Sequence, residues 1–125
     1  VICEYGTEIY DINGDYNITT DTFTAPVAGT YLFHMGIRCN DGTTAHTQGT
    51  SVIVTSNLGY NQIFNFGNMV EQGSGAEVIY WRMSVQCDMD AADTAYCTMM
   101  VSGSTKIVDL GLSDNASRFS GILIA

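Results

Sequence analysis

The strongest constraint on the fold of this chain is the segment around its only proline. Residues 22–33 contain two apolar segments, the first ending at Phe23, and Pro26 and Gly29 separate them. Proline lacks an N–H group and interrupts a β-ladder, whereas glycine permits a bend. Beyond the bend, apolar side chains recur at every second position, which is typical of a strand with one face on a core. These side chains are Tyr31, Phe33, Met35, Ile37 and Cys39.

The composition favours one all-β domain spanning residues 1–125. A chain of this length buries roughly two-thirds of its extended surface, which is enough for a single core. Thirteen glycines and only four Lys and Arg residues favour strands and turns over surface helices. The alternating segments add up to about eight to ten strands, and the sequence shows no internal repeat. This pattern predicts a two-sheet jelly roll. We expect strands at residues 9–12, 16–23, 30–39, 51–56, from 60 onward, and at 77–89, 94–101, 106–110 and 118–125.

The charge balance argues against nucleic acid and membranes as partners. The net charge is −9, and the only cationic side chains are Lys106, Arg38, Arg82 and Arg118. With so few, we expect no basic stripe and no binding of phosphate backbones. No apolar run of about 18 residues is present, so we expect no membrane insertion. The sequence does not start with an initiator Met. We therefore interpret the chain as the C-terminal part of a longer polypeptide.

The four cysteines are Cys3, Cys39, Cys87 and Cys97, and none of them forms a C-x-x-C motif. Cys87 and Cys97 flank an expected hairpin and share the parity of the inward residues, so they could face each other across it. Two interpretations stay open. They are either buried free thiols or a disulfide.

Three motifs along the chain together resemble a known family. The first is Phe-Thr-x-Pro-x-x-Gly-x-Tyr-x-Phe, which residues 23–33 match. The second is the turn at residues 88–93, and the third is Phe-Ser-Gly-Ile-Leu from Phe119. In this combination the chain resembles the globular head of complement C1q and its tumour-necrosis-factor-like relatives, from about Ile9 to the end. The motif residues, to which we assign structural roles, are Phe23, Pro26, Gly29, Tyr31, Phe33, Asp93, Phe119 and Gly121.

The resemblance implies a jelly roll of about ten antiparallel strands that assembles as a homotrimer, often at the tip of a stalk. In the second motif, Ala92 stands where the family has glycine and Met89 where leucine is usual. The form of the corner is similar to heads from bacterial and viral sources. A surplus of aromatic and Met side chains over what one small core needs also favours a closed trimer.

No enzyme is expected, because no nucleophile motif or metal triad accompanies the two histidines, His34 and His46. His34 has outward parity in its strand, which favours a structural role facing solvent or a neighbouring subunit. The acidic residues near 88–93 are best interpreted as a solvated turn. We expect no cofactor, although calcium is an alternative, because carboxylates such as those of the acidic cluster can bind it and the resemblance implies a calcium site in some trimers, at positions that match Asn57 and Asn65. The weak calcium candidates are Asn57, Asn65, Asp88 and Asp90.

Aromatic and amide side chains after residue 59 are candidates for ligand binding. Tyr60, Asn61 and Phe64 could form a surface that binds sugars or protein, or they could be buried in the core or a trimer interface. The sequence therefore predicts a non-enzymatic trimeric recognition head at the extracellular or virion surface. The favoured form is a viral or phage fibre tip or adhesin that binds a host-surface protein or glycan. The alternatives are a structural trimerisation or capsid-decoration module without a host ligand, and a secreted C1q-domain recognition protein.

Overall fold

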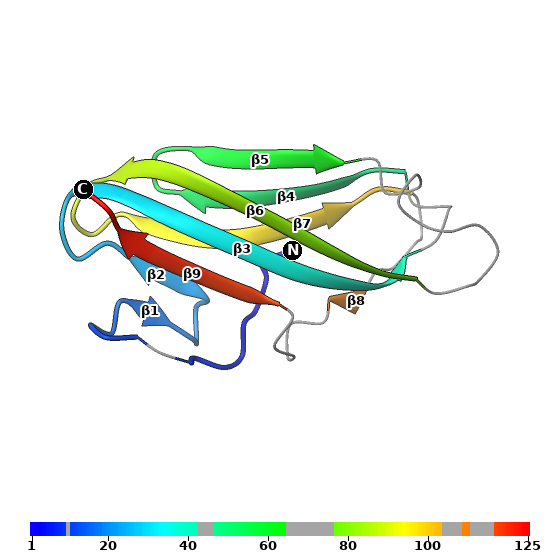
Figure 1. The fold of residues 1–125 in the computed structure, drawn as a ribbon, viewed down its shortest axis with the longest axis horizontal. Coiled ribbons are helices and arrows are strands. Elements are labelled where there is room, and N and C mark those ends of the chain that lie inside the picture. The colour runs from blue at the N-terminus through cyan, green and yellow to red at the C-terminus, as the bar shows by residue number, and fades with distance from the viewer. Residues whose placement is uncertain (10, 43–46, 65–76, 104–108, 111–116) are drawn as a thin grey trace.

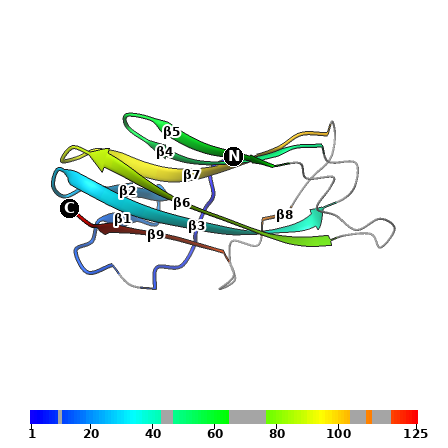
Figure 2. The same ribbon diagram turned by 45° about the horizontal axis from the view of Figure 1, so that its top comes forward.

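The computed structural model describes residues 1–9, 11–42, 47–64, 77–103, 109–110 and 117–125, and it is an all-β sandwich of two facing sheets (Figure 1). Sheet A has the spatial order β1 (Tyr16–Asn17), β2 (Thr22–Thr24), β7 (Thr94–Val101), β4 (Gly49–Thr55) and β5 (Gly59–Phe64). Sheet B contains β6 (Glu77–Met89), β3 (Gly29–Gly42) and β8 (Asp109–Leu110), and β9 (Arg118–Leu123) also pairs with β3. All of these pairings are antiparallel, and the two layers are separated in the turned view (Figure 2). The predicted jelly-roll sandwich is confirmed.

The long strand β3 organises sheet B because its alternating residues face the core. Tyr31, Phe33 and Met35 are each at most 1% exposed. The side chains of the intervening residues point away from the core. The backbone of β3 pairs with β6 on one side and with β9 on the other. Alternation at period two therefore predicted both the strand and its buried face.

An aromatic cluster connects the proline corner to the C-terminal strand. The Phe23 ring packs edge-on against Phe33, with centroids 5.3 Å apart, and against Tyr31 at 5.5 Å. Phe119 of β9 stacks on Phe33 with centroids 5.4 Å apart. Such ring pairs stabilise a core by about 0.5–1.5 kcal/mol each beyond their buried area. Residues far apart in the chain thus share one core.

The N-terminal strands differ from the prediction. Residues 9–12 were expected to form a strand, and the described part of this segment does not. Residues 16–23 were expected to form one strand, yet the chain reverses between β1 and β2. The side-chain oxygen of Asn17 accepts a bond from the Thr19 N–H at 2.8 Å, and Asp21 has a positive φ of 52°. Asparagine and aspartate make such turns locally, and this preference outweighs the strand pattern.

The turn at residues 90–93 joins the two sheets and does not close a hairpin, which corrects a second expectation. β6 lies in sheet B and β7 in sheet A, so Cys87 and Cys97 are not paired across neighbouring strands. Cys97 instead lies beside Cys3, whose N–H donates to the Cys97 carbonyl at 2.9 Å. All four cysteines are buried, and none is in a disulfide in this structure.

The described residues contain nine strands, against about ten expected. The first residues of the chain add an isolated bridge, in which Ile2 pairs with Thr98 of β7. The expected strand at residues 106–110 appears as the two residues of β8, and its earlier part lies outside the described residues.

Candidate binding surfaces

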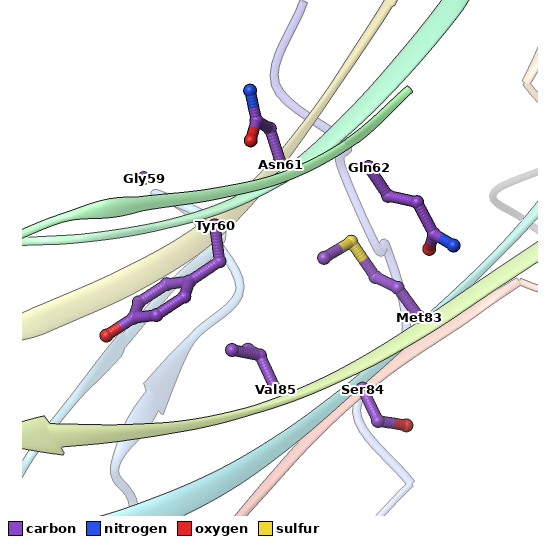
Figure 3. Close-up of a pocket in the computed structure, with 7 residues that line it drawn as sticks. All are labelled: Gly59, Tyr60, Asn61, Gln62, Met83, Ser84 and Val85. Atoms are coloured by element: carbon purple, nitrogen blue, oxygen red, sulfur yellow. The ribbon is translucent and has the colours of Figure 1, made fainter. Parts of the chain in front are cut away.

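One hollow is a cleft between the edge strands of the two sheets, β5 and β6. It measures about 530 Å³ and lies between β5 of sheet A and β6 of sheet B. We call it the β5/β6 cleft. In Figure 3, Tyr60 and Gln62 reach toward Met83 and Val85, whereas Asn61 and Ser84 point away. The residues that line it are Gly59, Tyr60, Asn61, Gln62, Met83, Ser84 and Val85.

Polar contacts between the two sheets involve Met83, one of the residues that line this cleft. The indole N–H of Trp81 donates to the Ser51 hydroxyl at 2.7 Å, so a polar bond joins β6 to β4. The Ser51 hydroxyl in turn lies 3.5 Å from the sulfur of Met83, to which it donates. Ser51 is fully buried, and a buried hydroxyl that is bonded on both sides holds its neighbours in one arrangement. The two bonds therefore connect Met83 of the cleft to Ser51 on β4 and, through it, to Trp81.

The sequence-predicted binding residues are only partly brought together. Tyr60 is half-buried and lines the cleft, and burial, followed by the charges of Cys87 and Asp88, raises the pKa of its phenol. The hydroxyl therefore stays neutral at ordinary pH and can donate a hydrogen bond. Asn61 borders the cleft but points outward, and the side chain of Phe64 lies outside the described residues. The sequence reasoning missed Gln62, although it shares the parity of Tyr60.

A second hollow, of about 300 Å³, lies at the turns that end β4 and β6. We call it the turn pocket. Three of the four calcium candidates line it, namely Asn57, Asp88 and Asp90, while Asn65 lies outside the described residues. The remaining lining residues are Ala28, Gly29, Thr30 and Met89.

The polar groups of the turn pocket are largely engaged with each other. The Thr30 hydroxyl donates to Asp88 at 2.6 Å, and one oxygen of Asp93 accepts from the side-chain amide of Asn57 at 2.8 Å and from the N–H of Asp90 at 2.9 Å. Within the described ranges, no group of three or more His, Cys, Asp or Glu side chains is placed to hold a metal ion. A calcium site at this pocket stays a prediction, and Asp93 lies at the turn that the motif indicated.

Three arginines, Arg38, Arg82 and Arg118, lie at positions on the outer face of sheet B. Gly36 of β3 is the partner of Arg82 on β6 and of Arg118 on β9. Arg38 lies two residues further along the same face. Strand pairing thus brings to one face arginines that lie up to 80 residues apart in the sequence, while the expected absence of a basic stripe that binds phosphate backbones stays a prediction. We call the line formed by Arg82, Gly36 and Arg118 the arginine row.

His34 lies next to the arginine row on the same face, as its outward parity predicted. It is exposed, and its Nδ1 lies 2.6 Å from the hydroxyl of Ser84 on β6. Ser120 of β9 is its partner on the other side. The second histidine, His46, lies outside the described residues.

No protein-family model and no curated protein sequence matches the chain. Among solved structures, the globular domain of zebrafish complement 1qA protein is similar over 99% of this chain and 84% of that one, with a TM-score of 0.68 and 17% sequence identity. The chain has a C1q-like head fold. The family resemblance drawn from the three motifs is thus confirmed for the fold.

A similarity at 17% sequence identity shows the fold and carries no information about a particular ligand. Within the described part of the chain, no helix is long and apolar enough to span a membrane. The β5/β6 cleft, the turn pocket and the outer face of sheet B are three surface features that the described residues place on this fold.

Proposed function

We propose that this chain is the non-enzymatic, trimeric recognition head of a viral or phage fibre or adhesin, and that it binds a host-surface protein or glycan at the extracellular or virion surface. The observation that carries the proposal is the β5/β6 cleft in a C1q-like head. It combines an aromatic ring and an amide from one strand with apolar side chains from another. This chemistry suits a sugar ring or a protein loop, because the ring stacks while the amide bonds to polar groups.

Exposed apolar side chains at the same two edge strands support assembly into a trimer. Ile63 of β5 is 58% exposed, and Val78 and Tyr80 of β6 are 44% and 53% exposed. Apolar groups clustered at an edge are a common sign of a subunit contact. A trimer with closed threefold symmetry would bury such edges in each subunit at once. The cleft would then lie close to a boundary between subunits.

The proposal is tested by measuring binding of the labelled head to candidate host cells and to an immobilised glycan panel. We expect saturable binding that falls at least about tenfold in Tyr60→Ala and in Gln62→Ala, since truncating a central contact commonly costs 1–2 kcal/mol. Met100→Ala serves as a control, because Met100 is exposed on the outer face of sheet A. Wild-type binding by Tyr60→Ala would contradict the assignment of the cleft.

A second candidate is a structural trimerisation or capsid-decoration module without a host ligand. The observation that favours it is a run of exposed apolar residues at the C-terminal end, where Ile122, Leu123 and Ile124 are 43–54% exposed. Such a run suits permanent contact with another structural protein. A correctly folded trimer that binds no cell or glycan, yet whose assembly with a structural partner is lost in Ile122→Asp, would favour this function over recognition.

A further inference from the structure

We propose that Cys3 and Cys97 form a redox pair, and that their oxidation to a disulfide fastens the first residues of the head to β7. We call residues 1–5 the N-terminal segment. The pair lies outside the β5/β6 cleft and outside the turn pocket, because neither cysteine lines either hollow. The inference is therefore independent of the proposed recognition function.

The backbone places the two cysteines directly opposite each other. Ile2 forms an antiparallel bridge with Thr98 of β7. In such a bridge, the residue that follows Ile2 lies opposite the residue that precedes Thr98. These two residues are Cys3 and Cys97. The N–H of Cys3 donates to the carbonyl of Cys97 at 2.9 Å, which fits this register.

Both side chains point into the core from the same face of sheet A. Residues that lie opposite each other in an antiparallel pair share a face, and both cysteines are 1% exposed. Ile53 of β4, the partner of Cys97 on its other side, is fully buried as well. Burial raises the pKa of Cys97, and the Cys3 thiol raises it further, as expected of two thiols that lie close together.

The spacing of opposite residues suits a disulfide. In an antiparallel pair their Cα atoms lie about 4.5–5.5 Å apart. A disulfide joins Cα atoms that are about 4.4–6.8 Å apart. An S–S bond between Cys3 and Cys97 therefore needs no large movement of the backbone.

The other two cysteines are placed less well for such a bond. Cys39 on β3 and Cys87 on β6 belong to sheet B, and stacked sheets are about 10 Å apart, so a bond from either to sheet A needs the layers to approach. Cys39 is also far from Cys87, because Cys87 is the partner of Tyr31, roughly 27 Å from Cys39 along β3. The geometry thus selects one pairing.

Formation of the bond requires an oxidant that accepts two electrons, and a small disulfide such as oxidised glutathione supplies this. The Cys3 thiolate attacks one sulfur of oxidised glutathione and releases one glutathione thiol. Cys97 then attacks the mixed disulfide at Cys3 and releases the second glutathione thiol. The two protons that the cysteines lose end on the two glutathione thiols, so one protein disulfide forms for each glutathione disulfide that is reduced.

The first attack requires the N-terminal segment to open. Burial raises the pKa of Cys3 to about 12, so the closed form holds almost no thiolate. The segment is joined to β7 by an isolated bridge, and Ile2 in that bridge is 46% exposed. Such a segment can open while the core stays folded. We therefore expect oxidation to be slow and its product to hold the segment closed.

The test is equilibration of the folded protein at pH 8 with oxidised and reduced glutathione, followed by alkylation of the remaining thiols and mass spectrometry. We expect two of the four thiols to be lost per chain. Digestion should yield the peptides of Cys3 and Cys97 joined by a disulfide. The oxidised protein should melt at least about 5 °C above the reduced protein, because the bond closes a long loop in the unfolded chain.

Alanine variants provide matched controls. Cys3→Ala and Cys97→Ala should each form no disulfide within the chain and show no rise in melting temperature on oxidation. Cys87→Ala should still lose two thiols and show the wild-type rise, since Cys87 lies in the other sheet. Circular dichroism checks that every variant is folded, and Cys3→Ala provides the test if Cys97→Ala is not.

The proposal is overturned if all four thiols persist at the most oxidising ratio, while the same reagent oxidises the protein in urea. It is also overturned if the disulfide joins any pair other than Cys3 and Cys97, or if it forms only between chains, which non-reducing electrophoresis detects. A melting temperature that oxidation leaves unchanged would likewise contradict the proposal.

Discussion

Gly121 of β9 lies directly opposite Phe33 of β3, and the space that a side chain at Gly121 would need is filled by the Phe33 ring. A Cβ atom built at Gly121 would come within 2.7 Å of the ring atom Cδ1 and closer still to Cε1. The ring is fully buried between Phe23 and Phe119, so it cannot move aside without disturbing the core. The glycine of the C-terminal motif therefore has a steric role that its partner on β3 defines.

Replacing Gly121 with alanine should destabilise the head by about 1–3 kcal/mol, because overpacking forces the aromatic cluster to shift. The free energy of unfolding is measured by denaturant titration. Gly6→Ala is the matched control, since nothing lies within 4 Å of a Cβ atom there. It should be neutral or slightly stabilising. Equal stability of the Gly121 and Gly6 variants would contradict the packing described.

Replacing Ala92 with glycine should stabilise the head by about 0.5–1 kcal/mol. Ala92 has a φ of 73° in the turn between β6 and β7, and a left-handed conformation costs an L-residue roughly 1–2 kcal/mol. Glycine removes that cost but gains entropy in the unfolded chain, so only part of it is recovered. Ala91→Gly, beside it and without a positive φ, should destabilise instead. Thermal unfolding of both variants checks the sign.

The buried thiols should make the head less stable in alkali. Burial raises the pKa of Cys3 to about 12, partly offset by the N-terminal ammonium group, and burial raises the pKa of Cys97 well above its usual value. An unfolded thiol ionises near pH 9, so above that pH the unfolded state loses protons that the folded state keeps. The stability that the two buried neutral thiols contribute is fully present below about pH 8. It is lost as the pH rises through 9 to 11.

This loss is expected to reach roughly 1.4 kcal/mol at pH 10 for each of the two thiols. Denaturant titrations at pH 8 and pH 10 measure it, and Cys97→Ala should show a smaller difference than the wild type. A stability that rises between these two pH values would contradict the burial of the neutral thiols. Thiol reagents should label the cysteines slowly until the protein unfolds.

Removal of divalent cations should change the melting temperature of the head by no more than about 1 °C, since a ligand stabilises a fold only when it binds the native state. The reason is that Asp88 already accepts from Thr30, while Asn57 donates to Asp93 at the turn pocket. The measurement compares melting in a chelator with melting in millimolar calcium. A decrease of several degrees in the chelator would show that the turn pocket binds calcium after all, and Asp90→Asn would then remove the difference.

The fold could be predicted largely from sequence because its strongest signals are local. Alternation from Tyr31 to Cys39 defines one face of β3, and the bounds of β6 and β7 follow from their alternating patterns and the turn between them. The reversal at residues 18–21 could not be read in the same way. There, the hydrogen bond that the Asn17 side-chain oxygen accepts from the Thr19 N–H and the left-handed backbone of Asp21 override a pattern that resembles a strand.

The candidate sites were harder to predict because they depend on pairing between distant strands. Tyr60 and Val85 meet only because β5 and β6 are edge strands of facing sheets. Arg82 and Arg118 flank Gly36 only because β3 lies between β6 and β9. Side-chain parity within one strand can be read from sequence, but the partner of that strand cannot.

The mass of the assembly in solution, measured by light scattering coupled to size exclusion, tests the central proposal of a trimeric head most directly. The account predicts a species of three times the 13.5 kDa chain mass that persists on dilution to micromolar protein. Tyr80→Glu, which places a charge on the exposed edge of β6, should shift the mass toward one chain while circular dichroism stays unchanged. A folded wild-type protein with the mass of a single chain would contradict the account.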